Sequence, residues 1–212
     1  MEVHNHDVKE QKSSFESKGF DPDKRVEPVP LKHGSGIVAH EKHTQNDLSG
    51  VNKENLDDNG TKYRETDHLL PNTQYELNGY KYETDNKGRI KSAEGKIRIK
   101  DPDYGRNMEN VRKYKSQEYN LSDDRGHLIA NQFGGSDRLG NVVPMDAKLN
   151  KSDYNRVENT LADAVKNGAD VKLKVEPIYG NDSSRPSDFQ VSYSIDGDKT
   201  VVVFKNKSEA KS

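Results

Sequence analysis

The sequence contains no cysteine among its 212 residues. This absence excludes disulfide bonds, thiolate metal ligands and a cysteine nucleophile, so any metal site must be built from oxygen and nitrogen ligands. Hydrophobic residues make up only 29% of the chain and charged residues 33%, which leaves few apolar side chains for a core that spans the whole length. We therefore expect part of the chain to lie outside the packed domain.

Long apolar runs are also absent. No stretch of the sequence approaches the ~18 to 20 residues that a transmembrane helix requires. The first 20 residues lack the hydrophobic centre of a secretory signal peptide. We expect no membrane segment, and export, if it occurs, must use a route that does not read a classical signal.

Charge is unevenly distributed along the chain. The net charge of −2 is unlike that of a typical nucleic-acid-binding protein. Residues 1–60 carry 8 Lys/Arg and 12 Asp/Glu, whereas residues 81–115 carry 11 Lys/Arg and 6 Asp/Glu. Residues 1–60 show no helix or strand periodicity, and we interpret them as a polar linker or disordered segment, with a partner-binding arm as the alternative. Residues 61–212 are expected to form the domain.

The first half of this domain predicts strands. Residues 75–84 alternate between apolar and polar side chains, residues 85–88 are typical of a turn, and an extended strand resumes at residue 89. We expect a β-hairpin with its tyrosines on one face. A short strand at 97–99 and a weak helix at 107–117 are expected to follow.

The second half predicts one long helix and three strands. Apolar residues recur at near-helical spacing between 146 and 167, and the Asn167-Gly168 pair is a typical helix stop. Alternating segments with a turn between the last two predict strands at 171–175, 189–195 and 200–204. The expected fold class is α+β, with a mostly antiparallel sheet.

The most informative stretch is residues 124–127, which read Asp-Arg-Gly-His and are followed by Asn141 and Asn150. Hydrolysis of a phosphodiester needs a base that takes a proton from water and a cation that stabilises charge on the phosphate. Histidine is mostly neutral near pH 7, so His127 is the candidate base. Mg²⁺ prefers oxygen ligands and keeps several waters, so the Asn150 amide oxygen can be its single protein contact.

Other charged residues near this stretch have weaker assignments. Glu158 follows Asn150 by eight residues, about 80° around an ideal helix. It could bind the same cation as Asn150 only if the helix bends or a water intervenes, so we expect a supporting role. Arg125 is expected to face away from His127 in an ion pair, and Asp124 to orient the backbone or an arginine. Arginine matches two phosphate oxygens at once, and the candidates for that contact are Arg89, Arg106, Arg112, Arg125 and Arg138.

These residues resemble the DNA/RNA non-specific endonuclease family, whose members carry an Asp-Arg-Gly-His motif on a ββα-metal (His-Me finger) core. The resemblance implies that His127 is the general base and that Asn150 binds a single Mg²⁺, for which Mn²⁺ could substitute. It implies supporting roles for Glu158 and Asn141, and a phosphate contact for Arg89, which follows the predicted hairpin. The matching segments are 124–127, 140–145, 148–150 and 156–158.

A further resemblance extends over residues 74–206. It is to the nuclease domains at the C-termini of bacterial polymorphic toxins, especially the type VII secretion (LXG) class of Gram-positive bacteria. It implies export by a type VII-like route without a classical signal peptide, action in the cytoplasm of a target cell, and a cognate immunity protein. The segments that carry it are 79–89, 124–135 and 185–197.

We therefore expect a Mg²⁺-dependent, sequence-non-specific endonuclease that cleaves DNA, with RNA as a second substrate, and leaves 5′-phosphate ends. Its protein–nucleic acid contacts are expected to be with the backbone. One alternative is a non-catalytic effector module that binds nucleic acid or a protein partner on the same scaffold. A phosphodiesterase for small substrates is the other enzymatic alternative.

Overall fold

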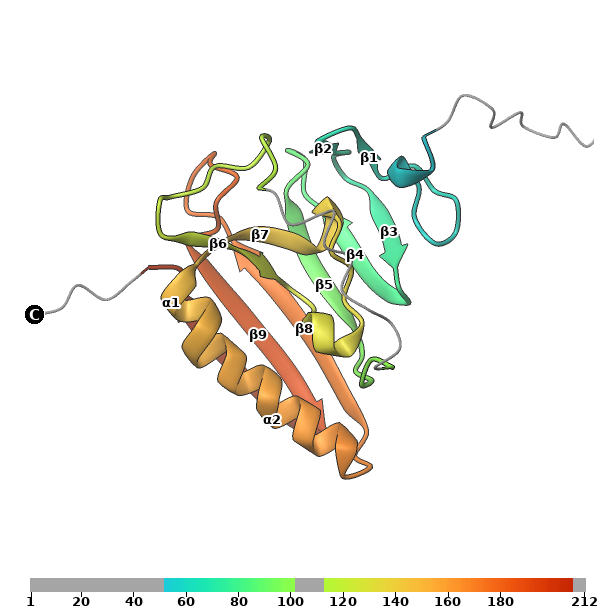
Figure 1. Cartoon of the computed structure of the whole chain (residues 1–212), viewed down its shortest axis with the longest axis vertical. Helices are drawn as coiled ribbons and strands as arrows, with labels where there is room; N and C mark the ends of the chain where they lie inside the picture. The colour runs from blue at the N-terminus through green and yellow to red at the C-terminus, as the bar shows by residue number, and fades with distance from the viewer. Residues whose placement is uncertain (1–51, 102–112, 208–212) are drawn as a thin grey trace, which may run out of the picture. The chain divides into compact units, whose positions relative to one another are not determined.

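The fold is α+β, as expected, and is built on one six-stranded antiparallel sheet (Figure 1). The computed structural model describes residues 52–101 and 113–207, and no helix in these ranges is long and apolar enough to cross a membrane. The strands of the sheet are β3 (Gln74–Leu77), β4 (Tyr80–Thr84), β5 (Ile90–Lys96), β8 (Val171–Ile178), β9 (Asp188–Ile195) and β10 (Asp198–Lys205). Their order across the sheet is β10-β9-β8-β5-β4-β3.

The folded domain begins earlier than we expected. A short 3-10 helix, η1 (Lys53–Asn55), precedes a small ribbon of β1 (Arg64–Glu65) and β2 (His68–Leu69). An isolated bridge pairs Leu56 with Lys62 and joins the segment to the ribbon. Residues 52–60 therefore belong to the domain and not to a linker. The remainder of the expected linker lies outside the described residues.

Two tight turns connect the first three strands of the sheet. Asn78 and Gly79 have φ values of 54° and 75° and join β3 to β4, which is the two-residue turn that Asn-Gly favours. We expected one strand over 75–84, and that prediction missed this turn. The turn at 85–88 and the tyrosine face are confirmed, because the side chains of Tyr75, Tyr80 and Tyr82 are all buried.

The long helix is confirmed, with an irregularity that we did not predict. Asp146 caps its start by accepting hydrogen bonds from two backbone N–H groups, and Gly168, with φ of 88°, follows its end. Between them run α1 (Ala147–Leu149), the π-helical turn η5 (Asn150–Tyr154) and α2 (Asn155–Lys166). The strand expected at 97–99 is not formed. The helix expected at 107–117 lies largely outside the described residues, and the described part is not helical.

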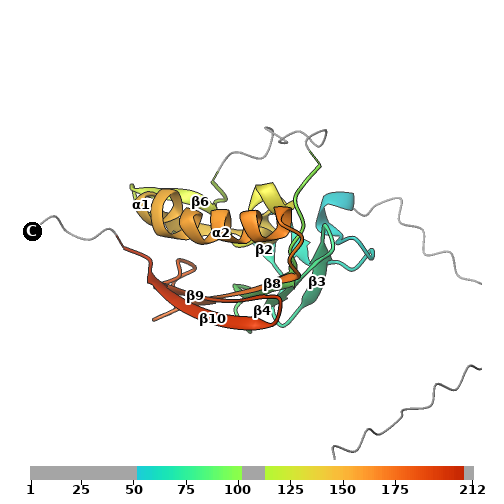
Figure 2. The ribbon, with the colours of Figure 1, turned by 90° about the horizontal axis from the view of Figure 1, so that it is seen from below.

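A two-stranded antiparallel ribbon of β6 (Asp123–His127) and β7 (Val142–Asp146) leads into this helix. The ribbon and the helix lie on the same face of the curved main sheet (Figure 2). The Tyr154 ring packs against Phe189 and Phe204 of the sheet, with ring centres 6.1 and 6.0 Å away, and its hydroxyl donates to the Leu128 carbonyl at 3.0 Å. Tyr154 thus joins the helix, the sheet and the residue that follows β6.

Candidate active site

The start of the ribbon is anchored by buried polar bonds. The Asp123 carboxylate is fully buried and accepts from Nε and Nη2 of Arg185 at 2.7 and 2.8 Å. Arg185 also donates to the Asn206 carbonyl at 2.8 Å. The Asn206 side chain in turn donates to the Pro144 carbonyl at 3.0 Å and accepts from the Asp146 N–H at 2.8 Å. These bonds fix both strands of the ribbon against segments that are distant in sequence.

Gly126 is required by packing within the ribbon. A Cβ atom at this position would lie 2.5 Å from the Cβ of Met145, and Met145 is fully buried. Real Cβ atoms do not approach so closely, so a larger residue would push the strands apart. The glycine of the Asp-Arg-Gly-His motif therefore lets β6 and β7 come together and sets the position of the next residue, His127.

His127 ends β6 with its ring partly exposed. Its Nε2 is hydrogen-bonded to Oδ1 of Asp137 at 2.7 Å. The pKa of the Asp137 carboxyl is lowered, chiefly by this hydrogen bond, so the group is charged at neutral pH. A charged carboxylate only accepts hydrogen bonds, so the neutral imidazole carries its proton on Nε2. That tautomer leaves Nδ1 as the atom that can accept a proton from water.

The sequence did not reveal Asp137 as a site residue. It lies ten residues beyond His127, in the loop that contains the 3-10 helices η3 (Asn131–Phe133) and η4 (Leu139–Asn141). Asn141 closes this loop, because its buried side chain accepts from the Ile129 N–H and donates to the carbonyls of Ile129 and Ser136 at 2.8 to 2.9 Å. Asn141 thereby supports the site without touching the imidazole.

Our expectation that Arg125 faces away from His127 was wrong. Nη2 of Arg125 donates to the backbone carbonyl of Asp137 at 2.6 Å, and the side chain of the same Asp137 binds His127. Residues two apart on a strand share a face, so the spacing itself places Arg125 and His127 on one side. The Arg125 guanidinium also lies 5.7 Å from the ring centre of Tyr114.

At the opposite end of β6, Asp124 meets Asn150. The Asn150 side-chain Nδ2 donates to Oδ2 of Asp124 at 3.3 Å, and the Lys151 ammonium lies 2.9 Å from the same oxygen. This bond uses the amide NH₂, so the amide oxygen of Asn150 remains available to a cation. An amide oxygen beside a carboxylate is a donor set that hard divalent cations prefer. The described residues contain no group of three or more His, Asp or Glu that could hold a metal, so these residues fit a cation that keeps most of its waters.

The structure therefore brings the predicted residues together in two groups on one strand. Arg125 and His127 meet at Asp137, whereas Asp124 meets Asn150. Asp124 and His127 are three residues apart, about 10 Å along a strand, and an odd spacing directs their side chains to different faces. Among the contacts of the described residues, no hydrogen bond joins the two groups.

Glu158 lies on the helix that carries Asn150. Burial raises the pKa of Glu158 to about 7, against a smaller opposing effect of a hydrogen bond with Asn155. The i→i+5 turn of η5 is wider than an α-helical turn, so it advances fewer degrees per residue and reduces the angle of about 80° between Asn150 and Glu158 on an ideal helix. Its pocket is lined by Leu128, Tyr154, Val157, Leu161, Leu173 and Val191. We therefore expect the helix irregularity to bring Glu158 nearer to the side of Asn150.

Arg89 has a different environment from the one we predicted. Its Nε donates to Asp85 at 2.7 Å, its Nη1 donates to the Asn181 carbonyl at 2.8 Å, and its guanidinium lies 4.2 Å from the ring centre of Tyr179. The side chain is only 15% exposed. Arg89 therefore braces the turn after β4 against the loop at 181–183, and these contacts do not support a role in catalysis.

Of the other predicted substrate-binding arginines, the described one, Arg138, does not join either group. Arg138 donates to the Leu56 carbonyl at 3.3 Å, on the side of the N-terminal segment. Arg106 lies outside the described residues. The basic side chain beside the histidine group is instead Lys100, whose ammonium is 3.5 Å from Oδ1 of Asn131. Asn131 in turn lies 3.4 Å from Asp137. Lys100 belongs to the basic stretch found in the sequence, although we did not single it out.

The chain is similar to known nucleases. Residues 71–197 match the model of a family described as DNA/RNA non-specific endonuclease. The type VII secretion system protein EssD of Staphylococcus aureus is 34% identical over 147 residues, which cover 66% of this chain and 24% of EssD. The probable deoxyribonuclease RhsA of Dickeya dadantii is 30% identical over 80 residues, which cover 38% of this chain and 6% of RhsA. The chain thus matches about a quarter of the length of EssD.

Two solved structures show a more distant likeness. The structure of the Sda1 nuclease with a bound zinc ion is 26% identical, covers 41% of this chain and 39% of its own, and has a TM-score of 0.39. An extracellular nuclease is 19% identical, covers 66% of this chain and 92% of its own, and has a TM-score of 0.43. The family match extends over more than half of the sequence, and the chain therefore belongs to the DNA/RNA non-specific endonuclease family.

Proposed function

We propose that the protein is a sequence-non-specific endonuclease that hydrolyses phosphodiester bonds in DNA, and in RNA as well, with one divalent cation. The observation that carries the proposal is the arrangement on β6. One end of this strand presents an imidazole held by a carboxylate, and the other end presents an amide and a carboxylate with oxygen atoms for a cation. Family membership supports the same reaction.

His127 acts as the general base in this proposal. Its Nδ1 takes a proton from a water molecule as the water attacks the phosphorus atom. The resulting imidazolium is stabilised by Asp137, which accepts the Nε2–H and also fixes the orientation of the ring. Asp137 itself stays charged throughout.

Asn150 and Asp124 would hold the cation, with Mg²⁺ as the proposed native ion and Mn²⁺ as a substitute. When bound, the ion would supply positive charge to a phosphate oxygen and to the departing 3′ oxygen, which leaves 5′-phosphate ends. Asp124 orients the Asn150 amide by accepting from its NH₂ group. Glu158 would contribute from the same helix through a water molecule.

Phosphate contacts explain the absence of sequence preference. Arg125 and Lys100 place positive charge beside the histidine group, within reach of the nucleic-acid backbone in this proposal. Contacts with phosphate position a nucleic acid but carry no information about its bases. Both side chains would bind DNA and RNA by the same chemistry.

The similarity to EssD supports a biological setting for this activity. We propose an antibacterial toxin effector that is exported by a type VII-like route and acts in the cytoplasm of a target cell. A cognate immunity protein would protect the producing cell. Because the matching region is about a quarter of EssD, this setting concerns the whole protein to which such a domain would belong.

A plasmid-nicking assay tests the reaction. We expect cleavage with Mg²⁺, none with EDTA, and a loss of about 10² to 10⁴-fold for His127→Ala, because that is the usual contribution of a general base. Asn150→Ala should lose activity and require more metal. The matched controls are His68→Ala and Asn159→Ala, which remove the same side chains from exposed positions and should retain activity.

Other outcomes would select the alternatives. If plasmid binding persists without any metal-dependent cleavage, or if His127→Ala cleaves as well as the wild type, the protein is a binding module on the nuclease scaffold. If a chromogenic phosphodiester is hydrolysed while plasmid stays intact, it is a phosphodiesterase for small substrates.

A further inference from the structure

The two edge strands of the main sheet differ in whether their outer backbone groups are hydrogen-bonded. At the β3 edge, the backbone groups of Glu76 are both satisfied, because its N–H donates to the Asp57 side chain and its carbonyl accepts from the Asp58 N–H, each at 2.9 Å. At the other edge, the eight residues of β10 pair only with β9 among the described residues. A long strand with one unpaired side is a template for another polypeptide strand.

The side chains of β10 leave the middle of this edge unprotected, because the lysines that disfavour edge pairing lie only near its two ends. Phe204 contacts Tyr154 of the helix, so alternation directs Lys199, Val201, Val203 and Lys205 to the opposite face. Val201 and Val203 are 61% and 53% exposed. The strand contains no proline and pairs with β9 without a bulge, although these are common means of blocking an edge. The outward pattern is thus two valines between two lysines.

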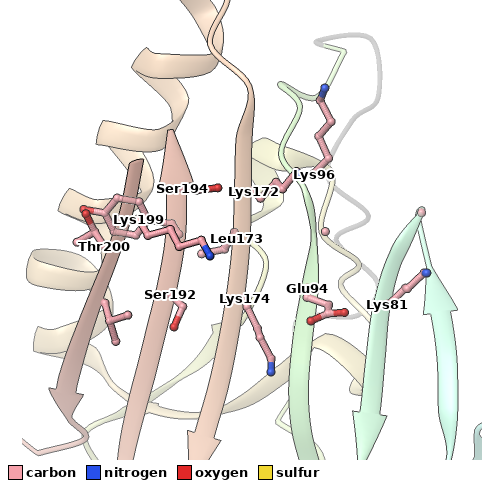
Figure 3. A pocket seen from close by; sticks show the side chains of 14 residues that line it. Lys81, Glu94, Lys96, Lys172, Leu173, Lys174, Ser192, Ser194, Lys199 and Thr200 are labelled. Atoms are coloured by element: carbon pink, nitrogen blue, oxygen red, sulfur yellow. The ribbon is translucent and has the colours of Figure 1, made fainter. Parts of the chain in front are cut away.

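A hollow of about 740 Å³ adjoins β10 on this outward face (Figure 3). Lys199, Thr200 and Val201 form its β10 side, and Figure 3 shows the Lys199 side chain extending across the neighbouring strand. Register places Lys199, Ser194, Lys172 and Lys96 in one row across four strands, about 14 Å in length. The charged residues that line the hollow are Lys81, Lys96, Lys172, Lys174, Lys199 and Glu94.

Much of this positive charge is not neutralised within the domain. Lys96 and Lys174 form ion pairs with Asp170 and Glu176 at 2.5 and 2.8 Å. In the part of the chain that the structure describes, the other three lysines of the hollow form no ion pair. Opposite charge in a ligand would complement them, so the hollow favours an anionic partner.

The same face disfavours an extended polyanion. Beyond β5, a second hollow of about 430 Å³ is lined by four acidic residues, Asp57, Glu76, Glu83 and Glu94. A nucleic acid that crossed the sheet would meet these carboxylates and would use neither the valines nor the unpaired backbone groups of β10. A short acidic segment of polypeptide fits β10 better, because it can add a strand, cover the valines and place a carboxylate beside Lys199.

We infer that β10 and the adjoining lysine hollow form a docking surface for an acidic, extended polypeptide segment. The segment adds a seventh strand beside β10 and pairs its alternate side chains with the outward row. An acidic side chain opposes Lys199, and apolar side chains oppose Val201 and Val203. A second acidic side chain competes with Asp188 of β9 for Lys205, which pairs with Asp188 at 2.5 Å within the domain. This surface lies on the face of the sheet opposite the β6–β7 ribbon, so its occupation does not depend on the proposed nuclease reaction.

A synthetic peptide tests the inference on the full chain with His127→Ala, which excludes any cleavage. The peptide has Thr at every second position, and the positions between them are Glu, Val, Val and Glu in that order. Its binding is followed by fluorescence anisotropy. We expect saturable binding that weakens with salt, together with slower hydrogen exchange at β10 amides. Val201→Lys with Val203→Lys, and separately Lys172→Glu with Lys199→Glu, should each reduce affinity at least about tenfold.

The control variant changes exposed apolar residues elsewhere. Ile99→Lys with Leu121→Lys adds the same charge at positions that are 38% and 107% exposed, and it should bind the peptide as the parent does. The same peptide with Lys in place of Glu should not bind. Far-ultraviolet circular dichroism and thermal unfolding check that each variant is folded.

Two results would overturn the inference. One is peptide binding that is absent, or equally strong in folded variants of β10. The other is binding of a DNA duplex that weakens in the Lys172→Glu, Lys199→Glu variant but does not slow hydrogen exchange at any β10 amide. That result would make the hollow a nucleic-acid site. If the wild type does not cleave plasmid but the peptide still binds, only the nuclease proposal is contradicted.

Discussion

Each end of strand β6 is hydrogen-bonded to or through a carboxylate, and the two ends differ in burial. At the start, Asp123 is completely buried and is held by Arg185, 62 residues away in sequence. At the far end, His127 and Asp137 are 19% and 14% exposed and are only ten residues apart. Distant, buried bonds fix the position of the strand, whereas a local, partly exposed pair is within reach of water and substrate.

This difference in burial indicates that different residues of β6 anchor the strand and take part in the proposed chemistry. Asp123 and Asp124 are neighbours, yet alternation sends the first to Arg185 and the second to Asn150. A buried ion pair contributes little net stability but makes the loss of one partner costly. We therefore expect substitution of Asp123 to act on folding and substitutions of the proposed site residues of β6 to act on catalysis.

The largest effect on stability is expected for Asp123→Ala. Removal of the carboxylate leaves the Arg185 guanidinium buried without its counter-ion, which costs about 3–5 kcal/mol of the free energy of unfolding. Urea denaturation followed by circular dichroism measures this loss. The double variant Asp123→Ala, Arg185→Leu removes both charges and should recover much of it. A loss below about 1 kcal/mol for Asp123→Ala would show that this pair does not anchor the ribbon.

Asp137→Asn should act mainly on turnover. The amide cannot enforce protonation of Nε2, so we expect kcat to fall about 10 to 100-fold with little change in KM. Stability should change by less than about 1 kcal/mol at neutral pH. The lowered pKa of Asp137 means that its contribution to stability is present above the unfolded-state pKa and is lost as pH falls through the folded-state value.

Plasmid-cleavage kinetics and urea denaturation at two pH values check this prediction. The matched control is Asp153→Asn, at an exposed carboxylate on the helix that pairs with Arg156, and it should leave both quantities unchanged. Equal losses of kcat in the two variants would show that Asp137 has no special relation to His127.

Much of the fold could be predicted because local patterns encode it. Alternation identified the C-terminal strands, and helical spacing with the Asn167-Gly168 stop identified the long helix. The Asn78-Gly79 turn was missed although the alternation changes phase there, because the buried positions shift from Tyr75 and Leu77 to Tyr80 and Tyr82. The π-helical turn η5 was missed as well, because the apolar spacing suggested a continuous helix.

The site was only partly visible for a related reason. His127 and Asn150 lie in a recognisable motif, but the partnership of Asp137 exists only after Asn141 has closed the loop between β6 and β7. The expected rotation of Glu158 depends on the π turn, which no apolar spacing revealed. Arg89 was assigned by its position after a hairpin, whereas its donors are used by Asp85 and by carbonyl groups of a distant loop.

Glu158→Gln provides a smaller effect that connects the two ends of β6. Glu158 shares a helix with Asn150 and lines the same small pocket as Leu128, the residue after His127. Its pKa of about 7 is above the ordinary value of 4.5, so the folded state binds more protons between these values and stability falls as pH rises. We expect Glu158→Gln to match the wild type near pH 4.5 and to be about 1–3 kcal/mol more stable above pH 8.

Mg²⁺ should narrow this difference at high pH. A cation held by Asn150 and Asp124 favours the charged form of a nearby carboxylate, so it would offset the cost of burying ionised Glu158. Urea denaturation with Mg²⁺ and with EDTA measures the effect, and Asp163→Asn, at an exposed position of α2, is the control. If Mg²⁺ supports cleavage but does not change the stability difference between Glu158→Gln and the wild type, Glu158 lies too far from the ion to assist it. The residues at the two ends of β6 would then not be coupled through Glu158.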